Sequence, residues 1–138
     1  VAVGIAQRAL ELAIAYSSST SQYGRSLSTY QGISFKIADI YTRITAARNM
    51  LYHVASMCDQ NMPYTTEVAA LKLFSTEICC EVCKDARQIH GAKGLSKDFE
   101  IERCLRDAHM LTVAEGTSEI CRIVISNAMY NSKIEDYS

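Results

Sequence analysis

A carboxylate followed by a glycine and two hydroxyl residues stands out in the segment AEGTSEI, at residues 114–120. Glu115 lies directly before Gly116, and the hydroxyl residues then begin a predicted helix. A carboxylate at a helix N-terminus is stabilised by the helix dipole, by about 0.3–1 kcal/mol. A carboxylate in a water-poor site can instead act as a base toward a bound substrate. The segment alone leaves both roles open.

Two further segments combine glycines with amide side chains. One ends a predicted helix in a turn with two glycines: QIHGAKG, at residues 88–94. The other is SQYGRSLSTYQGISFKIADI, at residues 21–40, which holds Gln22 and Gln31 on either side of Gly24. Glycine is a common residue just past the end of a helix. The first turn is therefore consistent with an ordinary helix end as well as with a ligand site.

Six cysteines and three histidines raise the question of disulfides and metal sites. The cysteines lack the short, loop-rich framework of a secreted disulfide scaffold, so we expect reduced core residues of an intracellular protein. The run CCEVC, at residues 79–83, contains a C-x-x-C, but no second ligand pair follows at zinc-site spacing. His53, His90 and His109 are expected to be core or surface residues. We therefore expect no metal site.

Hydrophobic periodicity predicts long helices. Residues 1–20 are apolar nearly all round, which is typical of a buried helix, and a loop with hydroxyl residues follows. The second helix has the clearest apolar stripe, at alternating steps of four and three, and Pro63 ends it. This stripe consists of Ile33, Ile37, Ile40, Ile44, Ala47, Leu51, Val54 and Cys58.

The rest of the chain predicts two more long helices and a short one. A helix from about residue 66 to 89 carries an apolar face, and a short helical stretch covers 100–110. That face consists of Val68, Leu71, Ser75, Ile78, Val82, Ala86 and Ile89. The last helix runs from about 117 to 130, with Ile120, Ile123 and Val124 expected to point inward. Short links favour antiparallel packing. We expect an all-α, up-and-down four-helix bundle with a short extra helix, forming one domain over residues 1–138.

The composition is that of an ordinary globular domain. The chain has 138 residues, of which 49% are hydrophobic and 21% charged, and a net charge of −1. Only 6 Gly and 1 Pro interrupt it, which favours long helices over many short strands. The chain lacks the cluster of basic residues that a dedicated nucleic-acid-binding or membrane-binding surface would need. Arg8 and Glu11 also interrupt the first apolar run before it reaches the length of a membrane span.

The segments above, together with LRDA at residues 105–108 and AQRAL at 6–10, resemble the C-terminal domain of the acyl-CoA dehydrogenases. The motifs follow the family's order and spacing over essentially the whole chain. The Q-x-x-G-G-x-G turn and the R-D-A…E-G-T run are specific when they occur together. The family's N-terminal helical domain and central β-domain are absent from these residues, so the resemblance implies a piece of a longer chain.

The resemblance implies an FAD-dependent oxidoreductase of fatty acid metabolism that introduces an α,β double bond into an acyl thioester, carried by CoA or an acyl carrier protein. Glu115 matches the family's catalytic base, which removes the α-proton, and Gly116 lets the backbone approach the thioester. Thr117 and Glu119 match positions near the flavin. Hydride from the β-carbon would pass to the flavin.

The resemblance also implies cofactor contacts at four other positions. Gln88 and Gly91 fall in the turn that in relatives contacts the adenosine part of FAD bound to a neighbouring subunit. Gln22 and Gln31 match flavin-contacting positions in and after the family's R-x-Q-F-G loop. The implied partners are a second copy of the chain, as a tetramer or dimer, and an electron-transfer flavoprotein. The implied location is the cytoplasm, or the mitochondrial matrix in a eukaryote.

Some positions depart from the family pattern. Thr20 stands where the R-x-Q-F-G loop has an arginine that pairs with the FAD pyrophosphate, and Arg25 lies five residues further on. Ala92 replaces the second glycine of the turn, and Lys93 stands where many relatives have Asn. The alternative is therefore a non-catalytic helical subunit that keeps the fold and has lost FAD. A di-iron bundle is excluded, because it would need paired Glu-x-x-His motifs.

Overall fold

The computed structural model describes the backbone of residues 1–135 and the side chains of residues 1–131, and this part is almost entirely helical. Its helices are α1 (Ala2–Ser19), α2 (Gln31–Asp59), α3 (Thr65–His90), α4 (Glu100–Leu111) and α5 (Ser118–Glu135). A short helical turn, η2 (Gly91–Leu95), follows α3. The all-α class predicted from the sequence is confirmed.

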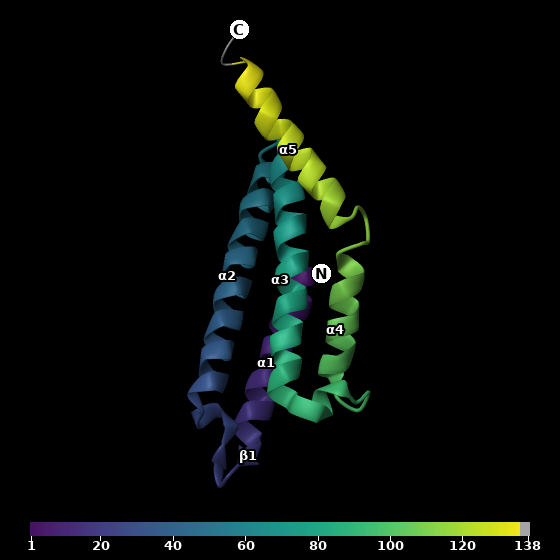
Figure 1. The fold of residues 1–138 in the computed structure, drawn as a ribbon. Coiled ribbons are helices and arrows are strands. Elements are labelled where there is room, and N and C mark those ends of the chain that lie inside the picture. The colour runs from purple at the N-terminus through teal and green to yellow at the C-terminus, as the bar shows by residue number, and fades with distance from the viewer. Residues whose placement is uncertain (136–138) are drawn as a thin grey trace.

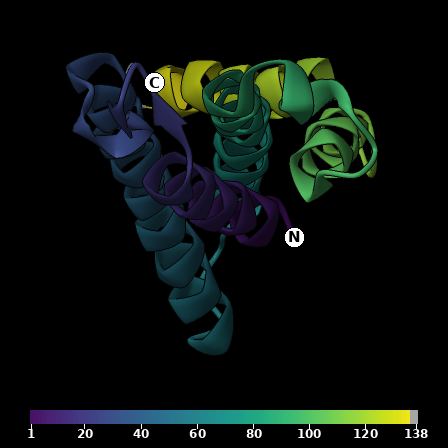
Figure 2. The same ribbon diagram turned by 90° about the horizontal axis from the view of Figure 1, so that it is seen from below.

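Helix α3 is the central element of the bundle and packs against each of the other helices. Successive helices from α1 to α4 alternate in direction, as short links require, and α5 lies obliquely across the end where α3 begins (Figures 1 and 2). The chain turns between α2 and α3 at residues 60–64, which include Pro63. The up-and-down arrangement expected from the short links is therefore present.

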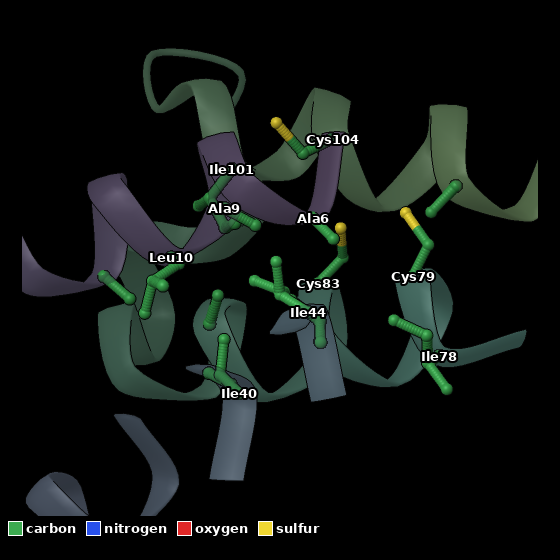
Figure 3. Packing of buried hydrophobic residues seen from close by; sticks show 14 of the residues in the cluster. Ala6, Ala9, Leu10, Ile40, Ile44, Ile78, Cys79, Cys83, Ile101 and Cys104 are labelled. Atoms are coloured by element: carbon green, nitrogen blue, oxygen red, sulfur yellow. The ribbon is translucent and has the colours of Figure 1, made fainter. Parts of the chain in front are cut away.

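The core lies where α1, α2, α3 and α4 meet (Figure 3). Ile40, Ile44 and Ile101 are completely or almost completely buried there. They pack against alanines of α1, whose small side chains let the helices approach closely. All six cysteines are free, and Cys79 and Cys83 belong to this core. Cys58, expected inside, is exposed.

The segment between α1 and α2 contains a small hairpin that the sequence pattern had indicated only as a loop. Strands β1 (Ser21–Gln22) and β2 (Arg25–Ser26) pair antiparallel across a two-residue turn, and the short helical turn η1 (Leu27–Thr29) follows them. Both turn residues have positive φ, 50° at Tyr23 and 80° at Gly24. This combination is typical of the tight hairpin turn whose twist matches that of its strands. It sets the path of the chain into α2.

The prediction for the inner face of the last helix is wrong for Ile120 and Ile123, whereas Val124 is half-buried. Ile120 and Ile123 are each 52% exposed, whereas Ser118 and Cys121 are buried. Helix α5 packs chiefly on α3 and not inside the bundle, so only a narrow face of it is covered. An ion pair between Arg122 and Glu77 of α3, at 2.6 Å, lies beside that contact. Helix α4, the short extra helix of the prediction, contributes core residues instead.

Candidate active site

The loop between α4 and α5 holds Glu115 in an unusual backbone conformation. Glu115 has a φ of 55° and Gly116 a φ of 107°. The left-handed region is costly for a residue with a Cβ, by about 1–2 kcal/mol, and such residues persist where the surroundings hold them. The loop is closed by the Ser118 N–H, which donates to the Thr112 carbonyl at 3.2 Å. The backbone of Glu115 is therefore held in place by the fold.

The start of α5 adds a helix cap directly after this loop. The Thr117 Oγ1 accepts a hydrogen bond from the Ile120 N–H at 3.4 Å, which is the N-cap arrangement. Glu119 lies exposed in the first turn of α5. Its own backbone N–H, the Thr117 hydroxyl and the charges of Arg122 and Lys72 hold the pKa of its carboxyl below the usual value. Glu119 is therefore an ionised acceptor close to the Glu115 loop.

Glu115 lies at the edge of an apolar groove of about 610 Å³. The start of α1, the middle of α2, the first half of α3 and the end of α4 form its walls. The apolar side chains that line it are Val1, Ala2, Val3, Leu51, Val68, Leu71, Met110, Leu111 and Ala114. The groove thus places a carboxylate next to a surface that suits a hydrocarbon chain.

The groove corrects two residues of the predicted helix stripes. Leu51 and Val68 were expected to face the core, but they are 40% and 39% exposed. Both line the groove. Their apolar character therefore belongs to the wall of a cavity, which periodicity cannot distinguish from the core.

One polar residue of the groove, Lys72 of α3, contacts the Glu115 loop directly. Its Nζ donates to the carbonyl of Thr112 at 3.4 Å and to the carbonyl of Gly116. Lys72 is not among the site residues predicted from the sequence. The signal available was its position four residues after Val68, where a charged residue falls on the apolar face of the predicted helix.

The other predicted site residues lie at the opposite end of the bundle, where α3 ends and α2 begins (Figure 1). Gln88 and Gly91 are exposed, and Gly91 ends α3 with a φ of 60°. Gln22 is exposed on β1, and its carbonyl accepts a hydrogen bond from the Tyr30 hydroxyl at 2.7 Å. Gln31 is exposed at the first position of α2. The structure therefore separates the predicted residues into two groups.

The positions that depart from the family pattern lie near this second group. Thr20 is half-buried and directly follows α1. The Arg25 guanidinium lies 4.4 Å from the centre of the Tyr30 ring. This cation–π contact occupies Arg25 within its own hairpin region. To bind a pyrophosphate in place of an arginine at position 20, Arg25 would have to give up this contact with Tyr30.

Two other kinds of site are absent from the described part of the chain. Its His, Cys, Asp and Glu residues form no group of three or more that could hold a metal ion. None of its helices combines the length and the apolar character needed to cross a membrane.

Comparison with known proteins shows to which family the chain belongs. The family model described as "Acyl-CoA dehydrogenase, C-terminal domain" matches residues 1–130. The chain belongs to the acyl-CoA dehydrogenase family. The resemblance inferred from the AEGTSEI and QIHGAKG segments is thus confirmed.

Two curated relatives illustrate the match. The chain is 44% identical over 129 residues to "Probable acyl-CoA dehydrogenase YngJ" of Bacillus subtilis, a match that covers 94% of this chain and 34% of that protein. It is 39% identical over 127 residues to "Caffeyl-CoA reductase-Etf complex subunit CarC" of Acetobacterium woodii, covering 92% and 34%. The chain therefore spans about a third of the length of these relatives.

A solved structure agrees with these sequence matches. The chain superposes on butyryl-CoA dehydrogenase from Megasphaera elsdenii with a TM-score of 0.92 and 36% identity, over 94% of this chain and 34% of that one. The helical fold of the acyl-CoA dehydrogenase C-terminal domain is thus shared by this chain.

Proposed function

We propose that residues 1–138 are the C-terminal helical domain of an FAD-dependent acyl-CoA dehydrogenase, in which Glu115 removes the α-proton of an acyl-CoA thioester. The observation that carries this proposal is the position of Glu115, on a loop with positive φ at the edge of a 610 Å³ apolar groove. Family membership supports the reaction class.

The groove and the loop divide the work that this reaction requires. An acyl chain bound along the apolar walls would exclude water from its α-carbon, which increases the strength of a nearby carboxylate as a base. Gly116 has no side chain, so backbone N–H groups of the loop can approach the thioester carbonyl. Such donors stabilise the negative charge that develops on the oxygen as the proton leaves.

The residues at both ends of the domain are of types that fit FAD. When bound, FAD supplies the acceptor for the hydride from the β-carbon. Gln22, Gln31 and Gln88 present exposed amides, and open space lies where a side chain of Gly91 would be. We propose that Gln88 and Gly91 hold the adenosine part of the cofactor and that Gln22 and Gln31 contact its flavin part. Thr117 and Glu119 would also lie near the flavin. Glu119 would then act as an ionised hydrogen-bond acceptor.

The separation of the two residue groups supports an oligomer. Gln88 and Gly91 lie where α3 ends, whereas Glu115 lies in the loop after α4, away from that end of the bundle (Figure 1). A second copy would supply the more distant group, which makes a dimer or tetramer part of the proposal. An electron-transfer flavoprotein is the proposed electron acceptor, in line with the name of the Acetobacterium relative.

The test uses the full-length protein with Glu115→Gln, which keeps the side chain's shape and removes its basicity. We expect FAD to remain bound while bleaching of the flavin by acyl-CoA slows by at least about a hundredfold, the lower end for a lost general base. Glu67→Gln, in the first turn of α3, is the control and should bleach like the wild type. Rapid bleaching by Glu115→Gln would remove Glu115 from the role of base. A wild-type protein that binds no FAD would favour the non-catalytic subunit instead.

A further inference from the structure

Lys72 joins α3 to the loop between α4 and α5, which is far from it in the sequence. Its Nζ, on α3, donates to the carbonyl oxygens of Thr112 and Gly116, which stand on either side of Glu115. Lys72 is half-buried in the wall of the groove that Glu115 borders. Within the described part of the chain it forms no ion pair with a carboxylate. Its contacts are therefore directed at the main chain of the loop.

The end of α4 is a favourable place for a positively charged donor. The last carbonyls of a helix have no partner within the helix, and a positive charge there is favoured by the helix dipole. Thr112 directly follows α4, and its carbonyl accepts from both Lys72 and the Ser118 N–H. The ammonium group thus lies at the end of α4 and also reaches the carbonyl of Gly116 across the loop, through two hydrogen bonds.

The loop's conformation gives this contact a further role. Glu115 and Gly116 have φ values of 55° and 107°, and a glutamate does not favour that region by itself. Without Lys72, the carbonyl of Gly116 would lose a charged donor, and the backbone of Glu115 could relax toward negative φ. That change would move the carboxylate relative to the groove.

We infer that Lys72 is a positioning residue that holds the 112–116 loop so that the Glu115 carboxylate stays at the edge of the groove. This inference rests on the proposed function for the role of Glu115. Lys72 acts through the loop's main chain and takes no part in the proton transfer.

The test compares Lys72→Met, Lys72→Arg and the control Lys84→Met in the full-length protein. Lys84 is an exposed lysine of the same helix. Two quantities are measured: hydrogen exchange of the amides of residues 112–118, and the rate at which acyl-CoA bleaches the bound flavin. Loss of a hydrogen bond from a charged donor corresponds to about tenfold to a hundredfold. We expect Lys72→Met to speed exchange and slow bleaching by at least about tenfold each, with FAD content unchanged. Lys72→Arg should recover most of both, and Lys84→Met should change neither.

Unchanged exchange in Lys72→Met would overturn the inference, because the loop would then be held without Lys72. Faster exchange with an unchanged bleaching rate would also overturn it, because the carboxylate would not depend on the loop. A wild-type protein with no bleaching at all would contradict the proposed function, and exchange alone would then decide whether Lys72 holds the loop. If Lys72→Met does not fold, Lys72→Gln, which keeps an N–H donor without the charge, takes its place with the same criteria.

Discussion

The two glycines of the 88–94 turn meet different physical needs. Gly91 adopts a φ of 60°, a backbone conformation that residues with a side chain rarely adopt. The position that its Cβ would occupy is open space. Gly94 is buried, and a Cβ added to it would lie 2.7 Å from the Arg87 carbonyl oxygen. The glycine at 91 thus allows the chain to leave α3, and the glycine at 94 allows it to pack back against the helix end.

Gly94→Ala should destabilise the domain by about 1–3 kcal/mol, because the crowding atom belongs to the backbone and cannot rotate away. Gly4→Ala is the matched control, since Gly4 lies inside α1 with nothing near its missing Cβ. That change should instead stabilise by up to about 1 kcal/mol through helix propensity. Urea unfolding of the 138-residue chain, followed by circular dichroism, measures both. Equal effects of the two substitutions would contradict the packing role of Gly94.

Thr20 stands at the position where an arginine would contact the pyrophosphate of the proposed cofactor. A hydroxyl offers one neutral hydrogen bond, whereas an arginine offers a permanent charge and planar donors that suit a pyrophosphate. We expect Thr20→Arg to tighten FAD binding by the full-length protein by about tenfold to a hundredfold, and less in high salt. Titration of the apo-protein with FAD at two ionic strengths measures this. Equal affinities would mean that position 20 does not face the cofactor or that another residue, such as Arg25, already supplies the charge.

At the scale of elements, an aromatic cluster fixes the end of α3 to α1. The buried His90 ring stacks on Tyr16 of α1 with centroids 4.4 Å apart, and it meets the edge of Phe99 at 6.4 Å. Its Nδ1 donates to the Ala86 carbonyl at 2.8 Å. The Lys93 Nζ lies 5.9 Å from the centre of the Tyr16 ring and 5.9 Å from the centre of the Phe99 ring. Burial lowers the pKa of His90 below its usual value of 6.5.

This lowered pKa makes the stability of the domain depend on pH. The unfolded chain binds a proton at His90 more readily than the folded one, so the free energy of unfolding falls as the pH drops below about 6.5. His90→Phe keeps an apolar ring and removes the titrating group. We expect the variant to lose about 1 kcal/mol at pH 7, with its hydrogen bond, and to show a flatter decline between about pH 7 and 5. His53→Gln, at an exposed site of α2, should keep the wild-type slope. An unchanged slope in His90→Phe would contradict the assignment.

At the scale of the whole molecule, the chain leaves much apolar surface uncovered. Ile120 and Ile123 of α5, and Phe35 and Tyr52 of α2, are each more than half exposed. Apolar surface on this scale is typical of faces that pack against another domain or subunit. It agrees with a chain that matches only about a third of its relatives' length.

The isolated 138-residue chain should therefore fold as a helical bundle and self-associate. It should bind no stoichiometric FAD, because it spans only about a third of the length of its relatives and we expect the rest of such a protein to contribute to the cofactor site. Sedimentation and the visible spectrum of the purified chain measure these properties. Ile123→Glu should weaken the association, because it places a charge on an apolar surface. A yellow chain with stoichiometric flavin, or a monomer at all concentrations, would contradict this prediction.

The helices and most of their ends could be predicted from the pattern of residues along the chain. The stripe through Ile40 and Ile44 has the period of a helix with one buried face, and this local property needs no partner to be recognised. Pro63 and Gly91 mark breaks through their own backbone preferences. The AEGTSEI and QIHGAKG segments likewise pointed to the family, which the family model confirms. Such motifs consist of residues that are close together in the chain, so they can be recognised without the fold.

What each apolar face covers depends on how the helices pack, and this could not be predicted from the sequence. Periodicity shows that a face is apolar, but not whether it meets another helix, a groove or solvent. Leu51 therefore lines the groove, and Ile123 lies on the surface, although both continue apolar patterns. The contact between Lys72 and Gly116 joins residues 44 positions apart, and it exists because α3 and the α4–α5 loop pack together. Spacing along the chain carries no signal for such a contact, since the fold alone sets the distance.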